Sequence, residues 1–171
     1  MAAVTRRTPN TTLAARIVVT LAAVAGCATE AQPGPPTLTS YLARGDRCKQ
    51  VAELAGAAAV VKIEAKAGEV PTPADAPPES IVAYLVSKEA AKLGWSREET
   101  RAFAREIWYA PPDADFKWEI LRAHLYYNAA CRLAAAGTPV RPYSTLTKQM
   151  QSCLGSRDEG AQIACAEAAI R

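Results

Sequence analysis

Apolar side chains recur at intervals of three and four residues along most of the chain after residue 45. This spacing places them on one face of an α-helix, whereas a half-buried strand alternates at every second position. Alternating runs rich in β-branched residues are absent after residue 27, and alanine, the strongest helix former, is abundant. The pattern predicts an all-α fold, a compact bundle of five to six helices with no sheet.

The first predicted helix runs from Asp46 to about Lys66. Asp46 is a suitable N-cap, because its carboxylate can accept a hydrogen bond from a free backbone N–H of the first turn. The alanines of this segment permit a neighbouring helix to approach closely. Gly68 ends the helix, and the four prolines in residues 69–78 predict an exposed loop.

The second and third predicted helices are joined by a tight turn. The second extends from about residue 78 to Gly94. Ser96 and Glu99 then form a capping box, in which each side chain accepts a hydrogen bond from a backbone N–H at the start of the third helix. Pro111 and the proline after it prevent this helix from continuing.

The fourth predicted helix is the longest, and we expect it to lie at the centre of the fold. Asp113 or Asp115 caps it, and it extends to about Ala136, a length of roughly 30 Å at the usual rise per residue. A fifth helix is capped by Ser144. A sixth begins at Arg157 and finishes the chain.

The first 26 residues follow a different pattern. Three arginines precede an apolar run of nine residues, 17–25, which fits a secretory signal and is too short to span a bilayer as a helix. The run leads into Val24-Ala25-Gly26-Cys27, which resembles the lipobox of bacterial lipoproteins. The resemblance implies that Cys27 becomes the mature N-terminus and carries a diacylglyceryl group.

These features divide the chain into a signal peptide (1–26), a proline-rich lipidated tether (27–40) and a single helical domain (41–171). The lipobox resemblance implies a bacterial cell-envelope protein that is anchored to a membrane by its lipid and faces the periplasm. Ala28 follows the lipidated cysteine, where lipoproteins retained in the inner membrane usually carry aspartate. This favours the outer membrane over the inner.

The net charge of +3 comes from the predicted signal peptide. Removal of Arg6, Arg7 and Arg16 lowers the count of basic residues from 20 to 17, against 17 acidic residues. A balanced charge gives no long-range attraction to nucleic acid, so no nucleic-acid partner is predicted.

Four cysteines remain when Cys27 is assigned to the lipid. In an exported protein they predict two disulfides, and the sequence alone allows three pairings of Cys48, Cys131, Cys153 and Cys165. We hypothesise the pairs Cys48–Cys131 and Cys153–Cys165. The second pair requires either that the last two helices cross steeply or that the sixth helix begins later, near Gly160. Zinc-type cysteine spacings are absent, so neither a metal nor a cofactor is predicted.

Aromatic residues concentrate in the third and fourth predicted helices, where eight of the eleven lie within 33 positions. Adjacent residues on a helix point in different directions, so the pairs 108–109 and 126–127 predict a partly exposed aromatic surface; burial of most of these rings in the core is the alternative. A row of Arg97, Arg101 and Arg105 lies on the polar side of the third helix; such a row is ordinarily a solvated face paired with Glu98 or Glu106, and binding of a carboxylate or phosphate is the alternative. The candidate binding surface consists of Trp108, Tyr109, Trp118, Tyr126, Tyr127, Arg101 and Arg105.

These observations predict an envelope-anchored module that binds a protein or peptide without enzymatic activity, an immunity or inhibitor protein being one specific form. One alternative is an enzyme acting on cell-wall material, with His124 and a carboxylate from Glu119 or Glu106 in a groove between the third and fourth helices. Another is a structural accessory subunit of an envelope complex. His124 has no Ser or Cys nucleophile near it in sequence.

Overall fold

The computed structural model describes residues 37–72 and 74–171. Cys27 and residues 28–36 of the predicted tether lie outside this range, so lipidation stays a prediction. The described residues contain helices and no strand, which confirms the all-α fold. None of these helices is long and apolar enough to span a bilayer.

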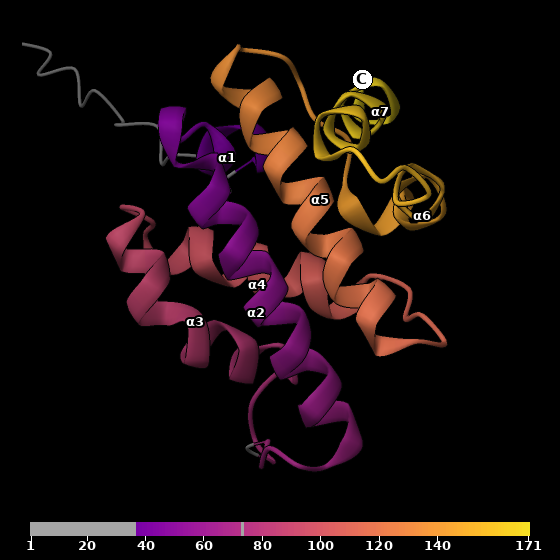
Figure 1. Ribbon diagram of the computed structural model, residues 1–171. Helices are drawn as coiled ribbons and strands as arrows, with labels where there is room; N and C mark the ends of the chain where they lie inside the picture. The colour runs from indigo at the N-terminus through magenta and orange to yellow at the C-terminus, as the bar shows by residue number, and fades with distance from the viewer. Residues whose placement is uncertain (1–36, 73) are drawn as a thin grey trace, which may run out of the picture. The chain divides into compact units, whose positions relative to one another are not determined.

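Seven α-helices make up the described part of the chain (Figure 1). They are α1 (Leu38–Leu42), α2 (Cys48–Ala67), α3 (Ser80–Lys92), α4 (Arg97–Tyr109), α5 (Phe116–Ala135), α6 (Thr147–Cys153) and α7 (Glu159–Ile170). Two 3₁₀ turns, Gly45–Arg47 and Tyr143–Thr145, precede α2 and α6. The six predicted helices correspond to α2–α7, whereas α1 was not predicted.

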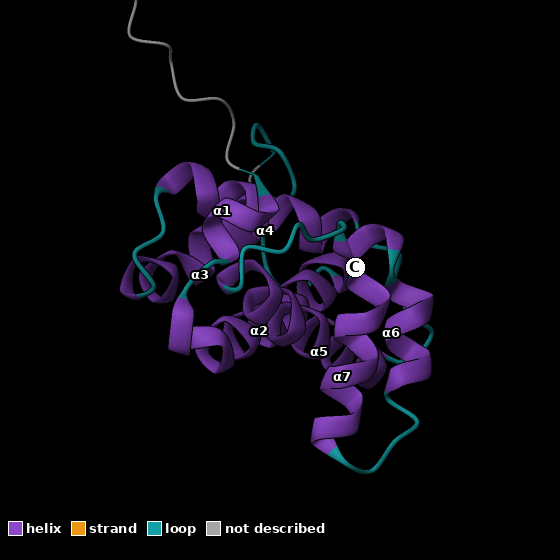
Figure 2. Cartoon of the chain, turned by 90° about the horizontal axis from the view of Figure 1, so that it is seen from above, coloured by secondary structure: helices purple, strands orange, loops and turns teal. Residues whose placement is uncertain are grey.

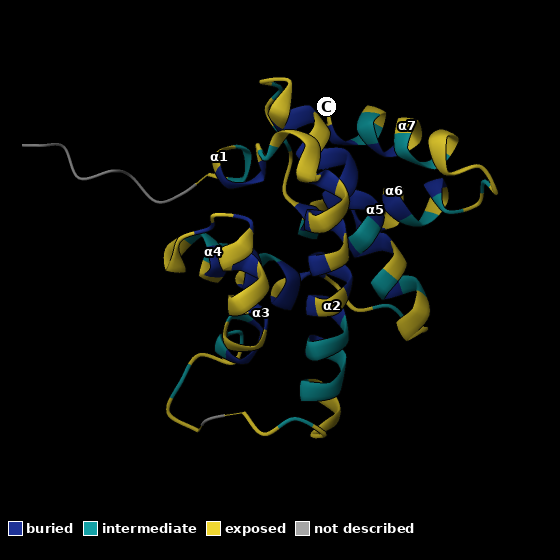
Figure 3. Cartoon of the chain, turned by 60° about the vertical axis from the view of Figure 1, so that its left-hand side comes forward, coloured by how far each residue is buried: buried dark blue, intermediate teal, exposed yellow. Residues whose placement is uncertain are grey.

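The two longest helices, α2 and α5, form an antiparallel pair at the centre of the domain. A disulfide joins Cys48 at the start of α2 to Cys131 near the end of α5, and an ion pair joins Lys62 to Glu119 at the opposite ends. The hairpin of α3 and α4 packs on α2, while α6 and α7 pack on α5 (Figures 1 and 2). The buried residues lie mainly along α2 and α5 (Figure 3).

Small residues let these two helices approach closely, as the sequence predicted. Ala55, Gly56 and Ala59 of α2 are buried. A Cβ atom added at Gly56 would meet Ile120 Cγ2 of α5 at 3.6 Å, which is ordinary van der Waals contact. The interface between α2 and α5 is therefore close-packed at this point.

The predicted signals at the ends of α2, α4 and α5 are confirmed. Ser96 Oγ accepts a hydrogen bond from the Glu99 N–H at 3.1 Å, and Glu99 Oε2 accepts one from the Ser96 N–H at 2.7 Å. Asp115 caps α5 by accepting from the Lys117 N–H at 2.8 Å. Gly68 follows α2 in the left-handed conformation, with φ of 80°, which glycine adopts without strain.

Two predicted caps are wrong. Asp46 lies within the 3₁₀ turn before α2 and makes no capping hydrogen bond there. Ser144 also lies in a 3₁₀ turn, because its N–H and hydroxyl both donate to Glu106 Oε1, each at 3.1 Å. This contact holds residue 144 against α4, and α6 begins three residues later.

The last helix begins later than Arg157. Asp158 caps α7 by accepting from the Ala161 N–H at 2.7 Å, so the helix starts at Glu159. This later start is one of the two arrangements that the Cys153–Cys165 pairing required. It shortens the distance along the helix axis from its start to Cys165 to about 9 Å.

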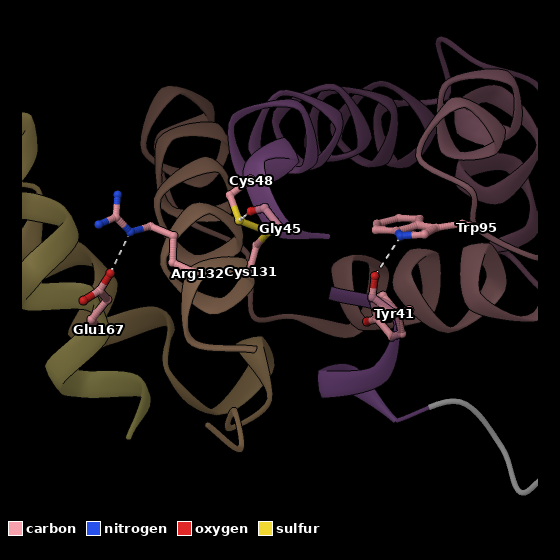
Figure 4. The surroundings of a disulfide bond; sticks show 7 residues. All are labelled: Tyr41, Gly45, Cys48, Trp95, Cys131, Arg132 and Glu167. Atoms are coloured by element: carbon pink, nitrogen blue, oxygen red, sulfur yellow. Dashed lines mark hydrogen bonds and ion pairs between the residues drawn. A yellow bond between two sulfur atoms is a disulfide. The ribbon is translucent and has the colours of Figure 1, made fainter. Parts of the chain in front are cut away.

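Both hypothesised disulfides are confirmed. The Cα atoms of Cys48 and Cys131 are 5.3 Å apart across a sequence separation of 83 residues (Figure 4). The Cα atoms of Cys153 and Cys165 are 5.6 Å apart across a separation of 12 residues. The first disulfide joins the two central helices, and the second closes the hairpin of α6 and α7.

The helical domain begins before the predicted boundary at residue 41. Residues 38–40, assigned to the tether, form the first turn of α1, and Thr37 Oγ1 accepts a hydrogen bond from the Ser40 N–H at 3.2 Å. Tyr41 and Leu42 are fully buried, and the Trp95 indole N–H donates to the Tyr41 carbonyl at 2.8 Å (Figure 4). Burial of its apolar side chains stabilises this short helix. Five residues are too few for a helical periodicity to be recognised in the sequence, so α1 was not predicted.

Candidate functional site

Two tyrosines of the predicted binding surface belong to the core. Tyr126 and Tyr127 are both 0 % exposed. Adjacent residues on α5 do point in different directions, but α5 is packed against α1, α2, α6 and α7, so side chains on most of its faces are covered. Trp108 is also buried and Trp118 is half-buried.

The buried rings form one continuous cluster. Neighbouring ring centroids lie 4.9 to 5.3 Å apart along a series from α1 to the second 3₁₀ turn, which consists of Tyr41, Trp95, Phe103, Tyr127, Tyr126 and Tyr143. The Tyr126 hydroxyl donates to the Arg141 carbonyl at 2.5 Å. Burial raises the pKa of all four tyrosines above the ordinary value, so their hydroxyls stay protonated in the folded protein. This aromatic concentration is therefore mainly structural.

The rest of the predicted surface is exposed on α4. Arg97, Arg101 and Arg105 are exposed and follow one another at intervals of four residues, and Tyr109 continues the row with 57 % of its surface exposed. We call these four residues the α4 row. From the first to the last it extends over about 18 Å of helix.

The three arginines of the α4 row form no ion pair with any described residue. Two of the nearby carboxylates have other partners, since Glu99 pairs with Arg44 at 3.0 Å and Glu106 binds Ser144. The third, Glu98, forms no ion pair with any described residue. The Tyr109 hydroxyl donates to Glu79 Oε2 at 3.3 Å, next to the start of α3. The guanidinium groups are therefore available to an external anion.

Two more apolar side chains are exposed on the neighbouring helix. Tyr84 and Leu85 of α3 are 74 % and 46 % exposed. Since α3 and α4 pack against each other as a hairpin, this hairpin carries both the arginines and three of the five exposed large apolar side chains of the described residues.

His124 lies elsewhere, in a shallow groove between α5 and α7. The groove has a volume of about 260 Å³ and is lined by Leu121, His124, Leu125, Asn128, Leu154, Glu159, Gln162 and Ile163. The predicted arrangement, with Glu119 or Glu106 beside His124 between the third and fourth helices, is wrong. Glu119 pairs with Lys62 at 2.6 Å, and Glu106 binds Ser144.

The groove was not predicted from the sequence. Leu121, Leu125 and Asn128 recur at helical spacing as one stripe of α5, and they line the groove on that side. The neighbouring helix, α7, is short and covers them only partly, which leaves Leu121 exposed. The periodicity identified the stripe, but not the length of the helix that packs on it.

A buried group of charged residues was also not predicted. Lys62 Nζ lies 2.6 Å from Glu119 Oε1 and donates to the Ala110 carbonyl at 2.8 Å. Glu119 Oε2 accepts from the Asp113 N–H at 3.2 Å, and Asp113 Oδ2 lies 3.3 Å from Arg122 Nη1. Burial lowers the pKa of Lys62, and its hydrogen bond and attraction to Glu119 partly offset this effect. The group fastens the loop before α5 to the end of α2.

Nothing in the described part of the chain resembles a metal site, since it contains no group of three or more His, Cys, Asp or Glu side chains placed to hold an ion. Comparison of the chain with protein-family models, with curated proteins and with solved structures gave no match. Function is therefore inferred from the geometry of the α4 row and of the groove.

Proposed function

We propose that this protein is a lipid-anchored component of the bacterial envelope that binds another protein through the α4 row. The observation that carries the proposal is the set of three exposed arginines without carboxylate partners, followed at the same spacing by an exposed tyrosine. Arginine and tyrosine are enriched at protein interfaces and at their energetic hot spots. Binding at this row requires no internal ion pair to be broken.

The partner surface is acidic. A guanidinium group binds a carboxylate through two parallel hydrogen bonds, and three of them in a row match carboxylates spaced about 6 Å apart along a partner helix or strand. Tyr109 supplies apolar contact area at the end of the row. Because the arginines are exposed, salt should weaken the association strongly.

The envelope location rests on separate observations. The residues before Cys27 resemble a lipobox, and the disulfides Cys48–Cys131 and Cys153–Cys165 suggest an oxidising compartment. With both central helices and the last hairpin covalently tied, the domain offers the α4 row on a rigid support, which lowers the entropy lost on binding. An immunity or inhibitor protein that masks a periplasmic enzyme is one specific form of this function.

The test is crosslinking and affinity capture from the native envelope with the full chain. A variant with Arg101→Glu and Arg105→Glu should lose the captured partner, whereas Tyr109→Ala should weaken binding by about 2 kcal/mol with little change in melting temperature. The matched control reverses two exposed basic residues outside the hairpin of α3 and α4, Lys148→Glu and Arg157→Glu. Loss of the partner in the control but not in the α4 variant would exclude the α4 row.

A further inference from the structure

The groove between α5 and α7 is lined by both apolar and polar side chains. Leu125, Leu154 and Ile163 supply apolar surface, and Leu121 lies at the exposed side. Its volume of about 260 Å³ is slightly below the usual range for small-molecule sites, which begins at roughly 300 Å³. The groove therefore fits a single long side chain or a small metabolite.

Asn128 is the best-placed polar group in the groove. The residue is only 9 % exposed, and its side-chain amide makes no hydrogen bond with any described residue. Neither amide atom of Asn128 is among the fully buried polar atoms that lack a partner, so the amide keeps contact with solvent and can exchange a bound water for a ligand. What remains accessible of Asn128 opens into the groove, where a ligand can bind its oxygen.

Gln162, on the α7 side of the groove, can also offer an amide oxygen to a ligand. Its side-chain nitrogen donates to the Ser156 carbonyl at 2.7 Å. This bond fixes the orientation of the amide and leaves its oxygen without a partner in the described part of the chain. Two amide oxygens, from α5 and from α7, are thus available to a hydrogen-bond donor in the groove.

The charge of the groove is negative. Among the eight lining residues Glu159 alone carries a formal charge, with His124 counted as neutral. Glu159 is exposed and forms no ion pair with the described residues, and neither Arg157 nor Asp158 lines the groove. A carboxylate and two amide oxygens match a ligand that carries a positive charge and several N–H donors.

We propose that the groove between α5 and α7 binds an ammonium or guanidinium group carried on an apolar stem. The stem lies against Leu125, Leu154 and Ile163, and the cationic head donates to Asn128 and Gln162 and pairs with Glu159. Either a free aliphatic amine or the side chain of a lysine or arginine in a peptide provides this chemistry. The site lies on α5 and α7 and is independent of the α4 row.

Nuclear magnetic resonance titration of the full chain in detergent tests the proposal. The probes are agmatine, a short alkyl chain with a guanidinium group at one end and an ammonium group at the other, and N-acetyl-leucyl-arginine amide; the acidic control is N-acetyl-leucyl-glutamate amide. Both cations should shift the amide signals of residues 121–128 and 159–163, with Kd near 1 mM, as expected for ligands of this size. If the arginine dipeptide binds tenfold more tightly than agmatine, the ligand is a side chain of a peptide. If agmatine binds as tightly as the dipeptide or more tightly, the ligand is a free amine.

The Glu159→Gln variant separates charge recognition from non-specific contact. Glu159 is exposed, so the change should leave the fold intact and weaken both cations about threefold, consistent with the loss of one solvent-exposed ion pair. The matched control is Glu98→Gln in the first turn of α4, which should leave the affinity unchanged. Asn128→Ala should also weaken binding. The proposal is overturned if neither cation shifts these signals at about 20 mM, if the acidic dipeptide shifts them equally, or if Glu159→Gln binds as well as the natural chain.

Discussion

Lys62 and Glu119 form an ion pair in the interior of the domain, with 2.6 Å between Nζ and Oε1 and with both side chains almost fully buried. Burying two charges is costly, and the cost is offset only when the remaining hydrogen-bonding groups also find partners. Here Lys62 also binds the Ala110 carbonyl, and Glu119 also binds the Asp113 N–H. The pair fixes how α2 and α5 align at the end opposite the Cys48–Cys131 disulfide.

Removing one partner of this pair should be strongly destabilising. Lys62→Met leaves the Glu119 carboxylate buried without its cation, and we expect a loss of about 3 to 5 kcal/mol in the free energy of unfolding. The double variant Lys62→Met with Glu119→Leu should recover much of this loss, because no uncompensated charge remains. Urea denaturation of the two single variants and the double variant measures the coupling. Additive losses would show that the two groups do not interact.

High pH should unfold the protein through its buried tyrosines. Burial raises the folded-state pKa of Tyr41, Tyr126, Tyr127 and Tyr143, whereas in the unfolded chain these hydroxyls ionise near pH 10. A raised pKa means that the folded state holds more protons above this pH, so stability is fully present below pH 10 and falls as the pH rises. Each tyrosine contributes a slope of up to about 1.4 kcal/mol per pH unit.

Lys62 acts in the opposite direction, because its pKa is lowered in the folded state and the unfolded chain therefore holds the extra proton. One lysine against four tyrosines leaves a net loss of stability. Urea denaturation between pH 8 and pH 11 measures how steeply the free energy of unfolding falls with pH. Tyr127→Phe should reduce this slope by about the contribution of one tyrosine. A stability that is constant or rises above pH 10 would contradict the prediction.

The two disulfides should contribute unequally to stability. In the chain-entropy account, closing the separation of 83 residues between Cys48 and Cys131 is worth about 4.5 kcal/mol, and the separation of 12 residues between Cys153 and Cys165 about 3 kcal/mol. We expect the double alanine variant of the first pair to be the less stable one in urea denaturation. Peptide mapping without reduction should join the peptides of Cys48 and Cys131. Recovery of Cys131 linked to Cys153 or Cys165 would overturn the pairing.

Gly56 offers a stabilising substitution. It lies inside α2, where glycine costs about 1 kcal/mol relative to alanine, and an added Cβ would make ordinary contact with Ile120. Gly56→Ala should therefore raise the free energy of unfolding by about 0.5 to 1 kcal/mol. Gly94→Ala is the control with the opposite sign, because Gly94 has a positive φ of 76° that alanine adopts only with strain. Thermal unfolding of both variants measures the two effects.

Lipidation is tested by mass analysis of the processed protein. We expect a mature chain that begins at Cys27 with a diacylglyceryl group on its thiol, and Cys27→Ser should block both lipid attachment and processing. A mature terminus at another residue, or an unmodified Cys27, would exclude the lipobox assignment.

Local chemistry predicted most of the helix boundaries. The capping box of Ser96 and Glu99, the cap at Asp115 and the stop at Gly68 depend on residues within one turn of each other. Such signals are read correctly from sequence because the partners are close along the chain. The predicted caps at Asp46 and Ser144 are wrong because a 3₁₀ turn replaces the first turn of each predicted helix. At Ser144 this turn is held by Glu106, which is distant in sequence.

Features that depend on distant neighbours were not predicted. Tyr126 and Tyr127 were expected at the surface because the sequence does not reveal that several helices surround α5. Lys62 resembles any polar residue of an amphipathic helix, and its partner Glu119 is remote in sequence. By contrast, the exposure of Arg101 and Arg105 was predicted, since they lie on the polar side of α4. For the pair 108–109 one partly exposed member was predicted without saying which, and it is Tyr109.

The Cys48–Cys131 disulfide also determines how the domain responds to proteolysis. The segment between α2 and α3 contains mostly exposed residues in its described parts, so it is the natural place for a protease to cut. A single cut there divides the chain, but α2 stays covalently joined to α5 and packed along it. Neither fragment is released until the disulfide is reduced, so a nicked molecule that carries the proposed lipid on Cys27 would keep the α4 row at the membrane.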